Sequence, residues 1–258
     1  NNFNGELSPN TGLFSIGIQG GEGGNIEGLP VSALHPYGRV VVGSTLKNRQ
    51  RTIYNFLKNQ KIQGDLIELD TDWLKVGHVD EIISVVPTAN SYKIFVFDTE
   101  LAISVYTNSL NDSSIIQNEI ISSFANVYFK SKYQMQRNQM KIRTDEIISI
   151  LRENGIQESQ LIRTPVLFQL KEKTDGSFAS LTECVLFNPI NSVYMIESNI
   201  RKVIFSGAAS YMPYCSYYTN ILSSIGYDSN TIFFLESTGI QASGGGSIHC
   251  ATILKRER

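Results

Sequence analysis

Short apolar runs alternate along the chain with longer stretches in which apolar residues recur at helical spacing. Runs of this kind, bounded by turn-forming residues, are typical of β-strands. The predicted strands cover residues 39–43, 65–69, 81–86, 92–97, 165–170, 184–187, 202–205 and 231–235. Strands that alternate with helices in this way predict a mixed α/β fold.

Two of the helical stretches are short. Residues 47–60 place Ile53, Phe56 and Leu57 on one predicted face. Residues 214–225 form the other short helix. Both stretches lie between predicted strands, as the helix of a β/α unit does.

The longest helical region extends over residues 114–154. Ile147, Ile150 and Leu151 form its predicted inner stripe near the end. Gly155 is the expected stop, because glycine is common just past a helix C-terminus.

The order of elements repeats along the chain, whereas the residues themselves do not. The repeated order is a strand, a helix and two further strands, and no linker or low-complexity tract interrupts it. We therefore predict a single α/β domain over residues 1–258. Its active site is expected where loops from several modules converge.

Composition narrows the classes of function. Hydrophobic residues make up 41% of the chain, and 22 basic against 24 acidic side chains give a net charge of −2. Nucleic acid is not an expected partner, because no block of basic residues stands out. A membrane is not expected either, since no apolar run approaches the roughly 18 residues that cross a bilayer. Three widely spaced cysteines form no disulfide framework and favour a reducing, cytoplasmic compartment.

His78 and Asp80 are the first candidates for chemistry. They are two residues apart, so in an extended segment their side chains would point to the same face. Gly77 precedes the pair and the apolar residues 82–86 follow it, which predicts a position at the mouth of a buried strand. A histidine and a carboxylate on one face can bind a cationic substrate and move protons.

Cys250 is the candidate nucleophile. It follows the glycine-rich stretch 244–246, which permits unusual backbone angles and close approach of a ligand to the main chain. Cys184 and Cys215 are flanked by strand and aromatic residues, so we interpret both as buried structural thiols.

These motifs together resemble a known family. Residues 72–81 resemble the block of protein-arginine deiminases that carries a catalytic histidine and an aspartate, and residues 248–252 resemble the block that holds the nucleophilic cysteine. Further blocks similar to that family are residues 24–27, 37–43 and 145–170. The similarity extends from about residue 12 to residue 254. It implies an α/β propeller of repeated ββαβ modules, the pentein fold.

The resemblance also implies what is missing. The family uses a second aspartate upstream of the block that corresponds to residues 24–27, and module order would place it before Asn1. We therefore expect a chain that lacks the first module or modules, with a second polypeptide as a possible carrier of them. An arginine that contacts the peptide substrate in vertebrate members would fall near residues 16–18, where this chain has none.

The activity implied is hydrolysis of the guanidinium of peptidyl-arginine to citrulline and ammonia. By resemblance, Cys250 attacks the guanidinium carbon, Asp80 pairs with two guanidinium nitrogens, and His78 protonates the departing ammonia. Trp73 and Gly246 are the further substrate-binding candidates. An arginine-containing protein or peptide is the expected partner.

Calcium is the one cofactor implied. In vertebrate members a glutamate and backbone carbonyls bind it, and the matching positions are Glu27, Gly23 and Ile26.

Two other functions stay open. Residues 244–250 also resemble a block of agmatine deiminases, which keeps agmatine or free arginine as substrates. The chain could instead be a guanidinium-binding relative without catalysis.

Overall fold

In the part of the chain that the structure describes, the repeated module suggested by the sequence is present three times. The computed structural model describes residues 23–49, 51–110, 133–172, 174–175, 177–184, 188–197, 199–205 and 212–235. Within them, three separate three-stranded sheets share one topology, in which the middle strand pairs antiparallel with the strand before it and parallel with the strand after it. A parallel partner requires a crossover, and helices supply it in each module.

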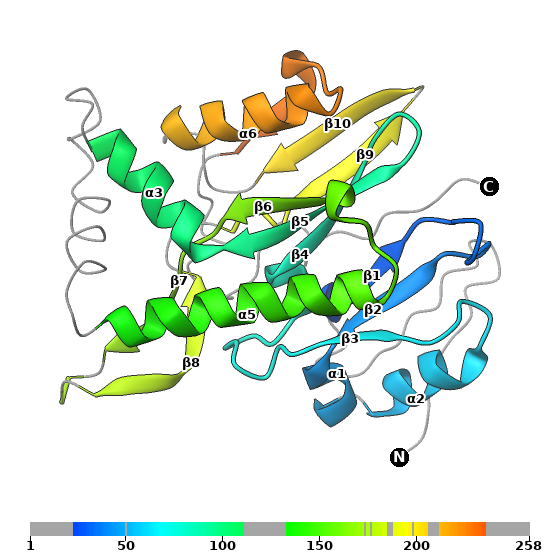
Figure 1. The fold of residues 1–258 in the computed structure, drawn as a ribbon, viewed down its shortest axis with the longest axis horizontal. Coiled ribbons are helices and arrows are strands. Elements are labelled where there is room, and N and C mark those ends of the chain that lie inside the picture. The colour runs from blue at the N-terminus through cyan, green and yellow to red at the C-terminus, as the bar shows by residue number, and fades with distance from the viewer. Residues whose placement is uncertain are drawn as a thin grey trace.

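The first module lies at the right of Figure 1. Its elements are β1 (Ile26–Leu29), β2 (Arg39–Gly43), α1 (Ser44–Arg49), α2 (Arg51–Gln60) and β3 (Ile67–Leu69). The β2 strand is buried along its whole length, because Val41 faces the main core and Val40 and Val42 face the two helices. This alternation follows from the two-residue period of a strand.

The second module contains the longest helix. Its elements are β4 (Ile83–Pro87), β5 (Tyr92–Asp98), α3 (Thr99–Leu110), α5 (Gln134–Glu153) and β6 (Leu161–Pro165). The α5 helix packs on β5 and extends across the front of the molecule to β3 of the first module (Figure 1). At its C-terminus, the Arg39 guanidinium donates to the Asn154 carbonyl and side-chain oxygens at 3.0 and 2.9 Å. Arg39 thereby ties the first sheet to the end of this helix, where positive charge is favourable.

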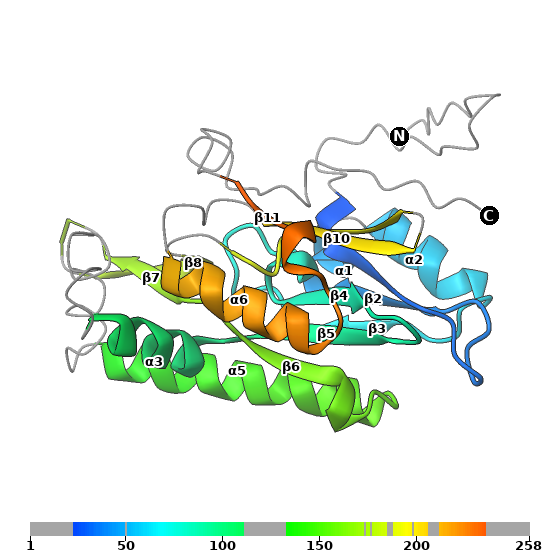
Figure 2. The same ribbon diagram turned by 90° about the horizontal axis from the view of Figure 1, so that it is seen from above.

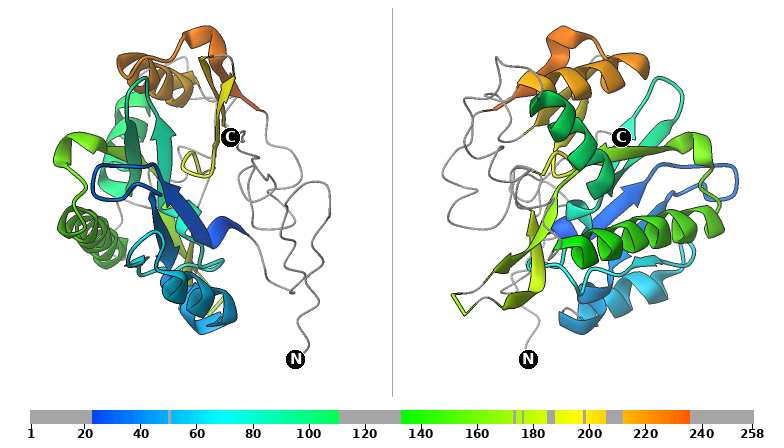
Figure 3. Two further views of the ribbon diagram at one scale, coloured as in Figure 1. Left: turned by 90° about the vertical axis from the view of Figure 1, so that its right-hand side faces the viewer. Right: turned by 60° about the vertical axis from the view of Figure 1, so that its left-hand side comes forward.

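The third module and a hairpin complete the described part. The module contains β9 (Val193–Glu197), β10 (Ile200–Phe205), α6 (Met212–Ser224) and β11 (Ile232–Phe234). The hairpin of β7 (Phe168–Glu172) and β8 (Phe178–Cys184) precedes it and projects at the end of the molecule away from the first module (Figures 1 and 2). Figure 3 shows α2, α5 and α6 around the outside of the strands.

A single large core joins the three modules. Its buried members include Val41 and Leu69 from the first module, Phe95 and Phe97 from the second, and Phe205 from the third. The ββαβ repeat is therefore confirmed. The described strands form open sheets, so a closed five-module propeller is not confirmed.

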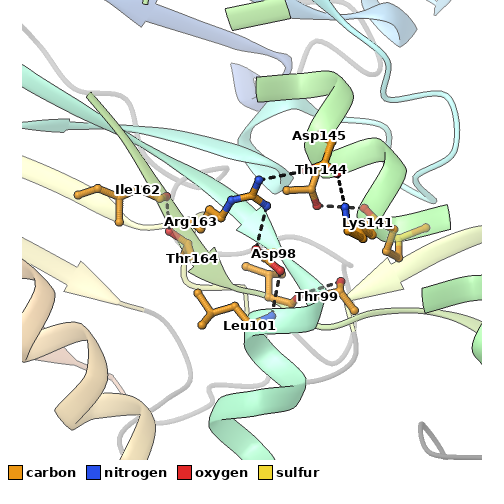
Figure 4. A network of polar contacts seen from close by, with 11 residues as sticks. Asp98, Thr99, Leu101, Lys141, Thr144, Asp145, Ile162, Arg163 and Thr164 are labelled. Carbon is orange, nitrogen blue, oxygen red and sulfur yellow. Dashed lines mark hydrogen bonds and ion pairs between the residues drawn. The ribbon is translucent and has the colours of Figure 1, made fainter. Parts of the chain in front are cut away.

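An ion-pair network fastens the outer side of the second module (Figure 4). Arg163 on β6 contacts Asp98 at the end of β5 and Asp145 on α5, each at 3.0 Å. The second oxygen of Asp98 accepts the backbone N–H of Leu101 at 2.9 Å and so caps α3. Lys141 lies 2.6 Å from Asp145, and its hydrogen bond is the main cause that lowers the pKa of that carboxyl.

Two sequence-based predictions were wrong. Phe56 is exposed, at 69%, and Tyr54 takes its place against the core, since the buried face of α2 is centred between Ile53 and Leu57. The predicted strand at residues 165–170 is the junction between β6 and β7. The helix α3 and the strands β1 and β9 were not predicted, whereas the predicted end of α5 before Gly155 is confirmed. Residues 114–132 of the predicted long helix lie outside the described residues.

No helix in the described ranges is both long and apolar enough to cross a bilayer. The longest, α5, carries polar and charged side chains along most of its length.

Candidate active site

The segment from Gly77 to Glu81 forms a tight turn before β4. Gly77 has φ +86°, and a Cβ placed on it would lie 2.6 Å from Cγ2 of Thr45, so both its backbone angle and its surroundings require glycine. His78 is extended, and Val79–Glu81 form a 3-10 turn, η2. The extended segment assumed for His78 and Asp80 is therefore wrong, because Val79–Glu81 form a turn and strand alternation does not apply to it.

The predicted position at the mouth of a buried strand is confirmed. His78 and Asp80 are 7% and 1% exposed, and the apolar side chains of β4 follow directly. Burial of an ionisable pair beside a core is costly unless hydrogen bonds hold the groups, so the partners of this turn determine what it can do.

Glu81 holds the start of the turn. Its Oε1 atom accepts the backbone N–H groups of Gly77 and His78 at 3.0 and 2.9 Å. Burial raises the pKa of Glu81 to about 7, the nearby charge of Asp80 adds to that rise, and the two backbone hydrogen bonds oppose it. The turn therefore contains a carboxyl that changes charge near neutral pH.

Asn25 holds the middle of the turn from the first module. Its Oδ1 atom accepts the backbone N–H of Val79 at 3.1 Å, and its Nδ2 atom donates to the hydroxyl of Thr45 at 2.6 Å. That hydroxyl in turn donates to the carbonyl of Gly77. A Cβ on Gly43 would lie 2.1 Å from the Asn25 oxygen, so glycine at position 43 leaves the room that this network needs.

Two asparagines from the third module hold the end of the turn. Asn191 Nδ2 donates to Asp80 Oδ2 at 2.7 Å, and Asn188 Nδ2 donates to the carbonyl of Glu81 at 2.7 Å. A Cβ placed on Gly24 would lie only 2.6 Å from the same Oδ2 atom. The Asp80 carboxylate thus lies close to the backbone of Gly24 and accepts a hydrogen bond from the amide of Asn191.

Trp73 is positioned as a core residue. It is 7% exposed, its indole N–H donates to the carbonyl of Asp70 at 2.8 Å, and its ring meets Phe97 and Phe168 with centroids 5.6 and 5.3 Å away. The Arg143 guanidinium covers the ring at 5.0 Å. These contacts account for its burial, and its predicted role in substrate binding stays a prediction.

The predicted nucleophile and one predicted substrate contact, Cys250 and Gly246, lie outside the described residues. The other two cysteines lie in or beside the core, with Cys215 buried on α6 and Cys184 half-buried at the end of β8. Burial raises the pKa of the Cys215 thiol, which disfavours its nucleophilic thiolate form.

The predicted calcium ligands lie at the start of the first module. Glu27 is buried on β1. Burial raises the pKa of Tyr194 well above its usual range, and the charges of Tyr227 and Glu27 add to that rise. Gly23 lies in the 3-10 turn η1 (Gly23–Asn25), and Ile26 begins β1. One carboxylate and two carbonyls are suitable hard donors, but calcium takes about six to eight oxygens. Within the described ranges, no three His, Cys, Asp or Glu side chains gather as a metal site.

Sequence reasoning missed the three asparagines. Asn25 lies in a block that resembles the family, whereas Asn188 and Asn191 belong to a polar stretch between strands that reads as an ordinary turn. No local signal connects Asn191 with Asp80, because 111 residues separate them.

Comparison with known proteins shows which proteins the chain resembles. Over 201 residues it is 26% identical to the mouse protein-arginine deiminase type-3, a match that covers 66% of this chain and 30% of the relative. Over 208 residues it is 25% identical to the human type-4 enzyme, covering 70% of this chain and 31% of the relative. A shorter match to the human type-1 enzyme is 43% identical over 61 residues, which are 22% of this chain and 9% of the relative. The chain thus spans less than a third of the length of these relatives.

Among solved structures, an agmatine deiminase from C. jejuni is similar at a TM-score of 0.45 and 14% identity, covering 89% of this chain and 54% of the other. The model of the family described as protein-arginine deiminase (PAD) matches residues 23–258, which include the turn of His78 and Asp80 and the predicted nucleophile. The chain belongs to the protein-arginine deiminase family.

Proposed function

We propose that the protein hydrolyses the guanidinium group of arginine in proteins or peptides, giving a ureido group and ammonia. The observation that carries this proposal is the Asp80 carboxylate, which is 1% exposed and is held at 2.7 Å by the amide of Asn191. An amide orients a carboxylate, and a buried carboxylate held in one orientation can pair with a planar guanidinium cation.

The chemistry needs a strong nucleophile, because a guanidinium is stabilised by delocalisation and is a poor electrophile. The Cys250 thiolate adds to the guanidinium carbon, and Asp80 fixes the cation through two N–H groups. The C–N bond then breaks as His78 gives its proton to the departing ammonia, which leaves a thiouronium on Cys250.

The second half of the reaction returns the enzyme. His78, now neutral, takes a proton from water as the water oxygen adds to the thiouronium carbon. The C–S bond breaks and the thiolate of Cys250 leaves. The hydroxyl proton passes through water to the released ammonia, and the product carries a neutral ureido group, which is citrulline for an arginine substrate. Every group in this cycle ends in its starting state.

Calcium belongs to the proposal only as a structural ion. Glu27 and the carbonyls of Gly23 and Ile26 would supply part of its shell, in the same segment as Gly24 and Asn25. The ion would fix this segment against Asp80 and takes no part in the steps above. Isothermal calorimetry measures the binding of CaCl2, with MgCl2 added as a competitor. We expect calcium binding to be lost in Glu27→Gln.

The test of function uses the complete protein. Ammonia release is measured from benzoyl-arginine ethyl ester and from agmatine, with Cys250→Ser as the inactive control and Cys215→Ser as the matched control. A haloacetamidine that mimics the guanidinium should label Cys250 alone. Turnover of agmatine but not of the arginine ester would move the proposal to small guanidines. Binding of either compound without ammonia release by the wild type would make the protein a non-catalytic guanidinium-binding relative.

A further inference from the structure

The loop that enters the third module is held tightly by its own polar groups. It covers residues 188–192, between β8 and β9. Asn188 Oδ1 accepts the backbone N–H of Ile190 at 3.0 Å, and the carbonyl of Asn188 accepts the backbone N–H of Asn191 at 3.2 Å. Asn188, Asn191 and Ser192 are 7%, 2% and 1% exposed. A loop that buries so many polar side chains is fixed in one conformation, because each must keep its hydrogen bonds.

This loop reaches the turn of His78 and Asp80 at two points of different kinds. Asn188 donates to a backbone carbonyl, that of Glu81, and so holds the path of the chain. Asn191 donates to the side-chain carboxylate of Asp80. The first contact fixes where the turn lies, and the second fixes how one side chain is rotated.

Rotation of this carboxylate matters for the proposed reaction. A guanidinium pairs with both oxygens of a carboxylate only when the two planar groups lie in one plane. Each carboxylate oxygen has two lone pairs, so Oδ2 can accept the Asn191 amide and still accept a substrate N–H. Gly24 lies against the same oxygen and leaves no room for a swing in its direction.

We propose that Asn191 is a positioning residue, which sets the plane of the Asp80 carboxylate for the substrate guanidinium and acts on the reaction only through Asp80. The inference rests on the proposed function. It adds a contribution from the third module to a site whose other described members come from the first and second.

The experiment compares three variants of the complete protein: Asn191→Ala, Asn191→Asp and Asn188→Ala. Asn191→Ala removes the 2.7 Å hydrogen bond to the Asp80 carboxylate. Asn188→Ala removes the 2.7 Å hydrogen bond to the Glu81 carbonyl and also the one from the Ile190 N–H, so it is the control for loss of structure in the same loop. The readouts are KM and kcat for benzoyl-arginine ethyl ester and the temperature of thermal unfolding. Asn191→Asp keeps the volume of the side chain and replaces the amide donor by a second carboxylate next to Asp80. If Asn191→Ala does not fold, Asn191→Asp is compared with Asn188→Ala instead.

Both Asn191 variants should lower kcat/KM by about 10- to 100-fold, the range for a hydrogen bond to a charged group, with a clear rise in KM. Asn188→Ala should unfold at a lower temperature, as Asn191→Ala does, but keep KM within about twofold, because a structural change alone reduces the active fraction rather than the affinity.

The two possible failures are distinguishable. If the wild type is active and the Asn191 variants have the KM of Asn188→Ala, the positioning role is wrong and the proposed function stands. If the wild type releases no ammonia from arginine derivatives or agmatine, the proposed function fails and the inference fails with it.

Discussion

Asp80 and Asp98 belong to the same module and are both nearly buried, but their surroundings are opposite in kind. Asp98 ends β5 and pairs with the Arg163 guanidinium at 3.0 Å, within the network of Figure 4. Asp80 precedes β4 and receives a neutral amide from a loop 111 residues away. Asp98 is matched by a charge on its own sheet, as a structural carboxylate is. Asp80 accepts a hydrogen bond from a neutral amide that orients its carboxylate, as the proposed binding role requires.

The difference also concerns exposure to solvent. The Arg163 and Asp145 side chains are 46% and 43% exposed, so water screens the outer network and reduces its contribution to the free energy of unfolding. By contrast, the side chains from other segments that hold the turn of His78 and Asp80 are buried: Asn25, Thr45, Asn188 and Asn191. We therefore expect changes at the turn to affect activity strongly, and changes in the outer network to affect stability weakly.

The largest effect is expected from neutralising the two aspartates in turn. Asp80→Asn should lower kcat/KM for an arginine ester by about 100- to 1,000-fold, since it removes one partner of a buried charge pair with the substrate. Asp98→Asn should leave activity nearly unchanged and reduce the free energy of unfolding by about 1 to 2 kcal/mol. Steady-state kinetics and urea unfolding measure both. Equal losses of activity would abolish the distinction between the two carboxylates.

Gly24→Ala should follow, with a loss of about 100-fold in kcat/KM, because the added methyl group displaces the Asp80 carboxylate from its position. The matched control is Gly155→Ala, where φ is +89° and no atom lies within 4 Å of the added Cβ. That variant should cost about 1 to 2 kcal/mol of stability through its backbone angle and leave kinetics intact. Wild-type kinetics in Gly24→Ala would show that Asp80 has room to move.

Glu81→Gln should change how stability depends on pH. The pKa of Glu81 is raised from 4.5 to about 7 in the folded protein, so the unfolded chain loses this proton first. Between these two pH values the folded state binds more protons, and the stability that Glu81 contributes below pH 4.5 is lost as pH rises to about 7.

The difference in free energy of unfolding between Glu81→Gln and the wild type should therefore shift by about 2 to 3 kcal/mol in favour of the variant as pH rises from the lower to the upper end of that range. Gln keeps an oxygen that can accept the two backbone N–H groups. Urea unfolding of both proteins across this range tests the prediction, and a difference that is constant with pH would contradict it.

The smallest effect belongs to the outer network. Arg163→Met should reduce the free energy of unfolding by about 1 kcal/mol, and less at high salt, because its ion pairs are half-exposed. Activity should be unaffected. A loss of activity comparable to that of Asp80→Asn would mean that the two regions are coupled through the shared sheet of β4, β5 and β6.

Much of the fold could be predicted from local patterns. The strands β2, β5 and β10 and the end of α5 lie close to where the apolar runs and Gly155 place them. Period-two and helical spacings are properties of neighbouring residues, so they survive in the sequence alone. The same reasoning misjudged Phe56, since the face of a helix that becomes buried depends on what it packs against.

The site was predicted only in part. Gly77, His78 and Asp80 were found together because a glycine, two polar residues and an apolar run lie within one short segment. Their geometry was not found, because the 3-10 turn depends on hydrogen bonds to Glu81 and Asn25 that the apolar pattern does not encode.

The sequence by itself determined the repeated module, the family and the segment that carries the candidate histidine and aspartate. Only the tertiary structure decided which side chains hold that segment. Asn25 and Asn191 come from two other modules, and the sequence stretch around Asn191 resembles an ordinary turn. The physical reason is that a buried carboxylate can accept a donor from any part of the chain that packs against it. The way the three modules pack around one core determines which donor reaches the carboxylate, and this cannot be read from the pattern of neighbouring residues.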